Sequence, residues 1–485
     1  MRDKNIGLCL ARGIGRFLAK ETMEMAEQIV QREFEDKNTN VKDVVTTAQL
    51  ERFRQLIRCE TVTNSDPAAV NWAAYEDLHR VFEQNYPTIY KEFTLTRIGE
   101  AGLQFHYKVS QPTAGPLLLM SHQDVVEPGD VEQWKEAPFS AEVKDNIVWG
   151  RGTTDCKHVV FAELEAVETL FASGWRPTYD LYISLGYSEE VYRQDGADGG
   201  RLLAENLAKQ NITLGCLIDE GGSIVKTPTG DTAAYIGLGE KSAVNFELYC
   251  DTAGGHSSKP GKGTGLGQIG RAIVAIEDNP LPYRLTPLVK ANLQASAPLQ
   301  EGKKATIYSD PEGHWEELCA LAQEDVELDA MLHTTFAVTM ASGSAQPNVM
   351  PSHATIGISC RILQGDTVES IISYLESIIP ETVKVRHLSG VDPQPTATVE
   401  SDEFALLTKV LRHIYGEAIH VIPYLMLGAT DSRYYKAVAP NAFRFSGFFQ
   451  DERWGKAHCV NERIPVDALA SGIVYFTEVL KAYGK

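Results

Sequence analysis

The segment that organises the chain runs from Leu117 to Val160 and begins Leu117-Leu118-Leu119-Met120-Ser121-His122-Gln123-Asp124. Its first four residues predict a buried strand, because they form a short apolar run between turn-forming and polar residues. Further on, Ile147-Val148-Trp149 predicts a short strand that leads through Gly150-Arg151-Gly152-Thr153-Thr154-Asp155 to a helix from about Cys156. The segment therefore places an imidazole and two carboxylates at strand ends and loops, where open α/β sheets carry their chemistry.

The same pattern continues after this segment. Leu181–Leu185 predicts a buried strand followed by Glu189-Glu190, and Cys216–Ile218 predicts another followed by Asp219-Glu220. Helices are expected at residues 156–172 and 201–210, between these strands. Alternation of strand and helix predicts an α/β fold in which helices flank a mainly parallel sheet.

The pattern changes after about Gly239. Residues 241–250 and 353–361 alternate between apolar and polar side chains, as half-exposed strands do, and helical segments follow each of them. We therefore expect a smaller α+β domain of the ferredoxin-like type, residues 241–390, inserted into a catalytic domain formed by residues 1–240 and 391–485. One or two further helices are expected at residues 14–36.

Composition excludes several classes of protein. The chain has 485 residues, enough for two domains, and a net charge of -20 from 65 acidic and 45 basic residues,. This surplus of acid argues against nucleic acid or an anionic membrane as a partner. No apolar run is long enough to span a membrane. The eight scattered cysteines lack a Cys-x-x-Cys pair, and the N-terminus is too charged for a secretory signal, so a cytoplasmic protein is expected,.

Side chains of the types that bind metals gather at five strand-end positions. Adjacent acidic residues at such positions raise one another's pKa unless a cation lies beside them, and a pair of divalent metals would supply the positive charge. Imidazole and carboxylate ligands without thiolates suit zinc, manganese or cobalt. The positions are His122, Asp155, Glu189-Glu190, Asp219-Glu220 and His458.

These segments resemble a known family. The chain is similar to the aminoacylase, carboxypeptidase S and glutamate carboxypeptidase family of dinuclear zinc hydrolases, and most similar to its carboxypeptidase S and N-fatty-acyl-amino-acid hydrolase branch. The resemblance runs in family order from about residue 45 to the end of the chain. It rests on Leu119-Met120-Ser121-His122-Gln123-Asp124-Val125-Val126, Trp149-Gly150-Arg151-Gly152-Thr153-Thr154-Asp155, Ser184-Leu185-Gly186-Tyr187-Ser188-Glu189-Glu190, Ile218-Asp219-Glu220-Gly221-Gly222, Gly255-His256-Ser257-Ser258, Thr430-Asp431-Ser432-Arg433 and His458-Cys459-Val460-Asn461-Glu462.

The resemblance implies two divalent metal ions, with zinc expected and manganese or cobalt as alternatives. Two such ions, about 3.5–4 Å apart, hold and activate a bridging water. The implied ligands are His122 on one metal, Glu190 and His458 on the other, Asp155 bridging both, and a fifth acid for which Glu220 is favoured over Asp219.

The resemblance also implies how an amide bond is cleaved. Glu189 is the general base that takes a proton from the attacking water and passes it to the leaving nitrogen. Asp124 orients His122, and His256 from the smaller domain stabilises the oxyanion. The expected reaction is therefore hydrolysis of a peptide or amide bond next to a free C-terminal carboxylate, by a carboxypeptidase or an N-acyl-amino-acid amidohydrolase.

The substrate carboxylate requires a cationic partner, and guanidinium groups offer paired donors. The resemblance implies Arg361 and Arg433 as this partner and Asn348 as a further substrate-binding residue. Arg361 ends a strand of the smaller domain, Asn348 lies in the turn before that strand, and Arg433 lies in the motif assigned to the larger domain. The expected substrate is a small peptide or an N-acyl amino acid. The resemblance leaves open a homodimer through the smaller domain.

Two departures from the family pattern leave the substrate preference open. Ser188 stands where the family usually has Asp, and Cys156 follows the bridging aspartate. A dipeptidase or tripeptidase on the same fold is therefore an alternative. A nucleotide-binding protein is disfavoured, because the glycine-rich stretch 261–267 lacks the spacing that cradles phosphates. A catalytically inactive binding protein is disfavoured by the intact ligand set.

Overall fold

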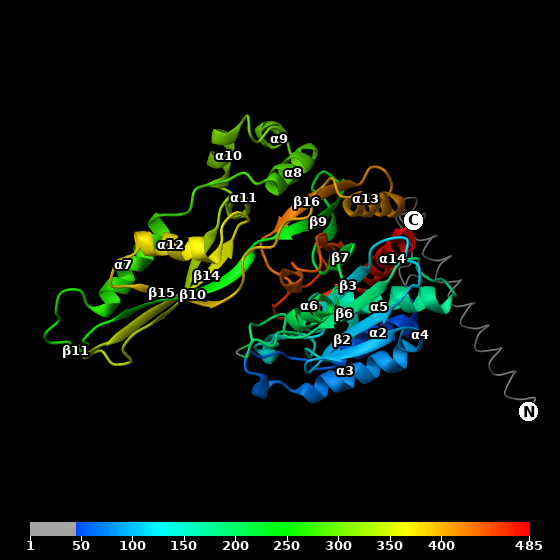
Figure 1. Cartoon of the computed structure of the whole chain (residues 1–485), viewed down its shortest axis with the longest axis horizontal. Coiled ribbons are helices and arrows are strands. Elements are labelled where there is room, and N and C mark those ends of the chain that lie inside the picture. The colour runs from blue at the N-terminus through cyan, green and yellow to red at the C-terminus, as the bar shows by residue number, and fades with distance from the viewer. Residues whose placement is uncertain (1–44, 194) are drawn as a thin grey trace, which may run out of the picture. The chain divides into compact units, whose positions relative to one another are not determined.

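The structure, a computed structural model, describes residues 45–485 except residue 194. The helices expected at residues 14–36 lie outside the described residues. The chain divides into two compact units (Figure 1). Unit 1 contains the described residues up to Gly237 together with Ala397–Ile422 and Tyr434–Lys485, and unit 2 contains Leu238–Thr396 together with Pro423–Arg433.

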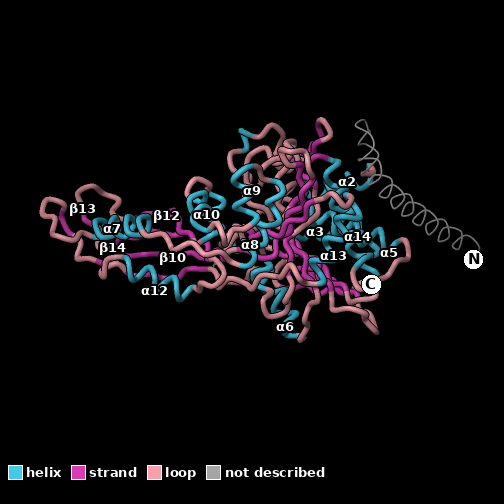
Figure 2. Tube along the Cα trace, turned by 90° about the horizontal axis from the view of Figure 1, so that it is seen from above, coloured by secondary structure: helices cyan, strands magenta, loops and turns pink. Residues whose placement is uncertain are grey.

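The elements of unit 1 can be followed by colour in Figure 2. Among the described residues, none of the helices is long and apolar enough to cross a membrane. The strands are β1 (Thr94–Ile98), β2 (Gly102–Tyr107), β3 (Leu117–His122), β4 (Glu142–Lys144), β5 (Ile147–Trp149), β6 (Leu181–Gly186), β7 (Cys216–Asp219), β8 (Ser223–Lys226), β17 (Ala442–Arg444), β18 (Phe449–Gln450) and β19 (Arg463–Pro465), with β9 (Thr232–Glu240) and β16 (His420–Met426) continuing into unit 2. The helices are α2 (Thr47–Arg58), α3 (Trp72–Asn85), α4 (Pro87–Glu92), α5 (Lys157–Ala172), α6 (Gly199–Lys209), α13 (Asp402–Tyr415) and α14 (Val466–Ala482).

The large sheet has a parallel centre. Its strand order is β1-β2-β6-β3-β7-β17-β9-β8-β18, with β16 paired to β9. Strand β3 runs parallel to β6 and β7, and β7 runs parallel to β17. Antiparallel pairs stand outside this centre, between β1, β2 and β6 and between β17, β9 and β8. The expected α/β class with a mainly parallel central sheet is thus confirmed.

Helices cover both faces of β3, and this burial explains why its sequence is a continuous apolar run. Leu118 and Met120 pack in one core cluster with Leu203 of α6. On the opposite face, the Ser121 hydroxyl donates a hydrogen bond of 2.8 Å to Glu163 of α5. Every residue of β3 is buried. The strand that ends in His122 is therefore fixed from both sides.

Unit 2 carries a separate sheet with its own core. The strands are β10 (Ser242–Asp251), β11 (Gly255–His256), β12 (Thr335–Ser342), β13 (Val349–Met350), β14 (His353–Ile362) and β15 (Lys384–Ser389). The helices are α7 (Gly265–Asp278), α8 (Pro287–Ser296), α9 (Gly302–Ser309), α10 (Trp315–Ala322), α11 (Val326–Leu332) and α12 (Val368–Ile378).

The main sheet of unit 2 is antiparallel, in the order β12-β14-β10-β15. Along the chain the order is β10, α7, β12, β14, α12, β15, which is the β-α-β-β-α-β arrangement of ferredoxin-like domains,. Alternate residues of β10 and β14, such as Phe246 and Ile358, are buried against Ile276 of α7 and Leu375 of α12. Helices α7 and α12 lie beside this sheet in Figure 1.

Two features of unit 2 differ from the sequence-based expectation. Helices α8 to α11 are inserted between α7 and β12, where no element was expected. Residues 423–433, expected in the larger domain, belong to unit 2. Hydrogen bonds explain this assignment, because the Lys241 N–H donates to the Met426 carbonyl at 2.9 Å and the Thr430 hydroxyl donates to the Glu240 carboxylate at 2.9 Å.

Candidate metal centre

The carboxyl ends of three parallel strands bring the first site residues together. In the sheet register, Leu119 of β3 lies opposite Ile183 of β6 and Ile218 of β7. The chain therefore leaves all three strands at the same edge of the sheet. His122 ends β3, Glu189 and Glu190 follow β6, and Glu220 follows β7. This register explains why the acidic pairs and the imidazole converge although they are far apart in sequence.

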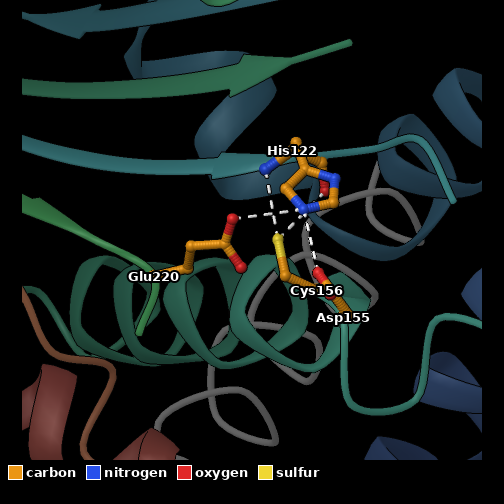
Figure 3. Close-up of side chains that lie close together, drawn as sticks. All are labelled: His122, Asp155, Cys156 and Glu220. Atoms are coloured by element: carbon orange, nitrogen blue, oxygen red, sulfur yellow. Dashed lines mark hydrogen bonds and ion pairs between the residues drawn. The ribbon is translucent and has the colours of Figure 1, made fainter. Parts of the chain in front are cut away.

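One group of donors surrounds His122. Its Nε2 atom lies 3.2 Å from Asp155 Oδ1 and 3.2 Å from Glu220 Oε1. Figure 3 shows these side chains, together with the sulfur of Cys156, around one small volume. The His122 side chain is only 1% exposed. This group therefore lies at the buried end of the centre.

A second group surrounds His458. Its Nε2 atom lies 3.1 Å from Asp155 Oδ2 and 2.9 Å from Glu190 Oε2. Asp155 thus turns one carboxylate oxygen towards each histidine. His458 lies in a turn rather than at a strand end, and its side chain is 54% exposed.

Asp124 forms hydrogen bonds with residues of both donor groups. The Nδ1–H of His122 donates to the Asp124 backbone carbonyl at 3.0 Å, which leaves the Nε2 lone pair free for a metal,. The Asp124 carboxylate lies 3.4 Å from the same nitrogen. It also accepts the backbone N–H groups of Glu189 at 3.2 Å and Glu190 at 3.3 Å. Asp124 therefore positions the acidic pair as well as the imidazole.

Several ionisable groups in the centre have shifted pKa values. Burial raises the pKa of Glu220 and of Glu190, and the charge of Asp155 adds to both shifts. Burial acts in the same sense on Asp155, but hydrogen bonds from His122 and His458 outweigh it and bring its pKa well below the usual range. Hydrogen bonds to Asp155 and Glu190 raise the pKa of His458 to about 10. Carboxyl groups that resist ionisation in a buried cluster mark a place where a cation would be stabilised.

The donor sets fit divalent metal ions. Zinc bonds of about 2.0–2.1 Å in a tetrahedron separate neighbouring nitrogen and oxygen donors by about 3.4 Å, close to the spacing found in both groups. Glu190 Oε1 is buried and has no hydrogen-bond partner among the residues that the structure describes. An orphaned carboxylate oxygen at this place is explained if a cation binds there. The residues present therefore suit two neighbouring divalent ions with imidazole and carboxylate ligands.

The two candidates for the fifth ligand lie in different surroundings. Glu220 lies within 3.2 Å of His122, as described above. Asp219 is buried at the end of β7, where its Oδ1 accepts the backbone N–H of Glu220 at 2.8 Å. Asp219 is not a member of either donor group in the described part of the chain. Glu220 is thus the acid that the fold brings to the centre.

The predicted substrate-binding residues belong to unit 2. His256 is exposed in β11, and its Nδ1 lies 2.8 Å from the Ser258 hydroxyl. Asn348 is exposed, and its carbonyl accepts the Ser257 N–H at 3.0 Å. Arg361 is half-buried in β14. Arg433, expected in the larger domain, lies in this unit, buried with Nη2 3.5 Å from Asp431 Oδ1.

Sequence reasoning missed a buried ion pair that joins the two metal-ligand loops. Arg151 Nη1 lies 2.5 Å from Glu462 Oε2, and both side chains are at most 2% exposed. The other Glu462 oxygen accepts the Thr154 N–H at 2.7 Å, directly before Asp155. Glu462 lies four residues after His458 in the motif quoted above, but its position there gives no sign of Arg151. We call Arg151 and Glu462 the latch.

Comparisons with known proteins show the family of this chain. The model of peptidase family M20/M25/M40 matches residues 118–482. The chain is 29% identical over 484 residues to carboxypeptidase S of Saccharomyces cerevisiae, covering 89% of this chain and 84% of that protein. It is 28% identical over 444 residues to the N-fatty-acyl-amino acid synthase/hydrolase PM20D1.1 of Danio rerio, covering 89% of this chain and 85% of that protein.

The fold is shared with solved structures. An M20 family metallo-carboxypeptidase from Sulfolobus solfataricus superposes with a TM-score of 0.65 at 18% sequence identity. The match covers 90% of this chain and 100% of that structure. At this level of identity the likeness concerns the fold alone.

Proposed function

The chain belongs to peptidase family M20/M25/M40, and on that premise we propose that it is a dinuclear metal-dependent hydrolase of amide bonds next to a free carboxylate. The family match and the relatives bear out the expected carboxypeptidase S and N-fatty-acyl-amino-acid hydrolase branch, and make the chain a hydrolase of peptide or amide bonds. One observation carries the proposal of two metals. The two oxygens of Asp155 face two different histidines, each of which also meets a second carboxylate.

The chain's own residues have distinct parts in the proposed reaction. When bound, two divalent ions, with zinc expected and manganese or cobalt as alternatives, would lower the pKa of a water molecule and polarise the scissile carbonyl. Glu189, whose backbone is held by Asp124, takes the proton of the attacking water and passes it to the leaving nitrogen,. The proposed ligands are His122 and Glu220 on one ion, His458 and Glu190 on the other, and Asp155 on both.

Unit 2 is proposed to supply groups for the rest of the substrate. His256 would donate to the oxyanion that forms at the carbonyl, with Asn348, the residue before β13, as a further polar group,. Arg361 and Arg433 are the proposed partners of the substrate carboxylate, because guanidinium groups bind carboxylates with paired hydrogen bonds. A homodimer through unit 2 stays a prediction.

Substitutions of the adjacent residues Glu189 and Glu190 distinguish the proposed general base from a proposed metal ligand. We expect Glu189→Gln to retain two metal ions per chain while turnover falls by about 100- to 10,000-fold, since an amide cannot transfer the proton. Glu190→Gln should instead lower the metal content, because it removes a charged ligand. Metal analysis of the dialysed proteins, with turnover of an N-acyl amino acid, measures both. Glu60→Gln, an exposed glutamate in the same unit, is the control. Near wild-type turnover of Glu189→Gln would refute its role as the base.

The substrate class is tested by removing one charge from the substrate. Amidation of the C-terminal carboxylate should lower kcat/KM by about 100-fold or more, because an amide has no negative charge for the guanidinium groups to bind. Arg361→Ala and Arg433→Ala should reduce this difference between acid and amide, whereas Arg386→Ala, an exposed arginine of β15, should preserve it. Equal rates on acid and amide in the wild-type enzyme would rule out an exopeptidase-type reaction. Faster cleavage of dipeptides than of their N-acylated forms would instead identify a dipeptidase.

A further inference from the structure

Cys156 is a buried thiol inside the His122 group. Its side chain is fully buried, and Sγ lies 3.3 Å from the His122 backbone nitrogen and 3.4 Å from the His122 carbonyl oxygen. Donor atoms of His122, Asp155, Cys156 and Glu220 all lie within 4.8 Å of one another. Figure 3 shows the sulfur on the same side of the imidazole as the two carboxylates. The thiol is therefore the fourth member of a donor cluster rather than an isolated cysteine.

We propose that Cys156 Sγ is a ligand of the metal at the His122 position, an inference that rests on the proposed dinuclear centre. The other three donors, two oxygens and one nitrogen, leave an open position for the water that the two ions would hold, and the nearby sulfur would add a further donor, as five-coordinate zinc allows,. As the ion binds, the thiol proton leaves to solvent and the sulfur becomes a thiolate donor. The backbone N–H of His122 stays beside the sulfur and stabilises its negative charge through a hydrogen bond,.

This ligand makes the two metal positions chemically different. The second group, formed by Asp155, Glu190 and His458, contains no sulfur. Thiolate ligands select zinc and other thiophilic ions, whereas carboxylate-rich sites also accept manganese. The His122 position should therefore bind zinc in preference to manganese, and the His458 position should exchange the two ions more freely.

The chain offers a matched control for a merely structural thiol. Cys216 is also buried, at the first residue of β7, the strand that leads to Glu220. It belongs to neither donor group within the described residues. Replacing Cys216 by serine tests the effect of losing a buried thiol from the same sheet without touching the metal cluster.

The decisive experiment is X-ray absorption at the zinc edge of the full-length wild-type protein loaded with one equivalent of zinc. We expect one sulfur neighbour at about 2.3 Å, the length of a zinc–thiolate bond. Cobalt loading should give a sulfur-to-metal charge-transfer absorption in the near ultraviolet. Cys156→Ala should abolish both signals and weaken the preference for zinc over manganese by about 10- to 100-fold, whereas Cys216→Ser should retain both.

The outcomes separate this inference from the proposed function. If zinc binds, the enzyme turns over and only nitrogen and oxygen neighbours are found, the cysteine is structural and the inference is overturned while the hydrolase remains. If the wild-type protein binds no metal, the proposed function itself fails. If Cys156→Ala does not fold, the wild-type spectrum alone decides, because it requires no substitution.

Discussion

The two histidines of the centre are supported in different ways. His122 ends a central strand that helices cover on both faces, and its ring is 1% exposed. His458 lies in a turn with a positive φ of 61°, and its ring is 54% exposed. The first position is therefore fixed by the sheet and its core, and the second by a few contacts of one loop. On the proposed dinuclear centre, this contrast predicts a preformed inner metal position and a more exchangeable outer one.

The loop that carries His458, here called the outer loop, is attached through the latch to the loop that carries Asp155. Arg151 and Glu462 form a buried ion pair, and the Glu462 backbone carbonyl accepts the Gly150 N–H at 3.0 Å. Strand β19, which follows Glu462, pairs with β5, which precedes Gly150. The exposed His458 is thus positioned by a buried ion pair and a short sheet.

Removing each histidine in turn should give the largest effects. We expect His122→Ala to lose both metal ions, because it removes the nitrogen ligand of the inner position and a contact that orients Asp155, the ligand proposed for both ions,. His458→Ala should retain one ion per chain. Turnover should fall by about 1000-fold or more in both variants, a loss of about 4 kcal/mol in transition-state stabilisation.

Metal analysis after dialysis distinguishes the two variants, and His413→Ala, an exposed histidine on α13 of the same unit, is the control. If His458→Ala lost both ions and His122→Ala lost one, the order of the two positions would be reversed.

A smaller effect is expected from the latch. Glu462→Gln should weaken metal binding at the outer position by about 10- to 100-fold, as is usual for residues that orient ligands, and leave the inner position unchanged. Breaking a buried ion pair also destabilises the fold, by about 3–5 kcal/mol. Metal titrations should therefore be performed well below the melting temperature, with Glu452→Gln as the exposed control.

A double variant separates orientation from stability. Arg151→Met combined with Glu462→Met removes both charges, so the thermal stability should largely recover. If the latch orients the outer ligands, metal affinity should remain low in this protein. Recovery of metal affinity together with stability would mean that the ion pair acts only through the fold.

Local sequence patterns predicted the strand ends at which much of the centre lies. Apolar runs followed by His122, by Glu189-Glu190 and by Asp219-Glu220 predicted strands with metal-binding side chains at their ends, since burial and strand length are local properties. The bridging position of Asp155 came from the family resemblance, and the structure places the side chain against both histidines.

Long-range pairings were not readable from the sequence. Arg151 and Glu462 are 311 residues apart, and no local pattern indicates that they meet. The contact between Cys156 and His122 likewise depends on how α5 begins beneath β3. Strand β16 contains Pro423, which weakens a strand prediction,. Helix α8 begins with Thr286 and Pro287, a capping signal that was present but not used,.

The smallest effect that still tests the comparison concerns Asn461, three residues after His458. Its Oδ1 accepts the Lys135 N–H at 2.7 Å, its Nδ2 donates to the Gln133 carbonyl at 3.3 Å, and its φ is 64°. The side chain thus attaches the outer loop to its neighbour, and the backbone adopts a conformation that asparagine and glycine tolerate better than alanine.

Two substitutions at Asn461 separate these contributions. Asn461→Gly removes the hydrogen bonds without backbone strain, so outer-metal affinity should fall about fivefold, equivalent to about 1 kcal/mol for a hydrogen bond. Asn461→Ala adds strain at positive φ, about 1 kcal/mol or more, and should lower that affinity by roughly a further fivefold. Neither should change binding at the His122 position, because β3 is held by the sheet and not by this loop. Equal loss at both positions, measured by zinc titration of each variant, would show that the two positions are ordered as one unit and that the contrast between a fixed inner and an adjustable outer ligand does not hold.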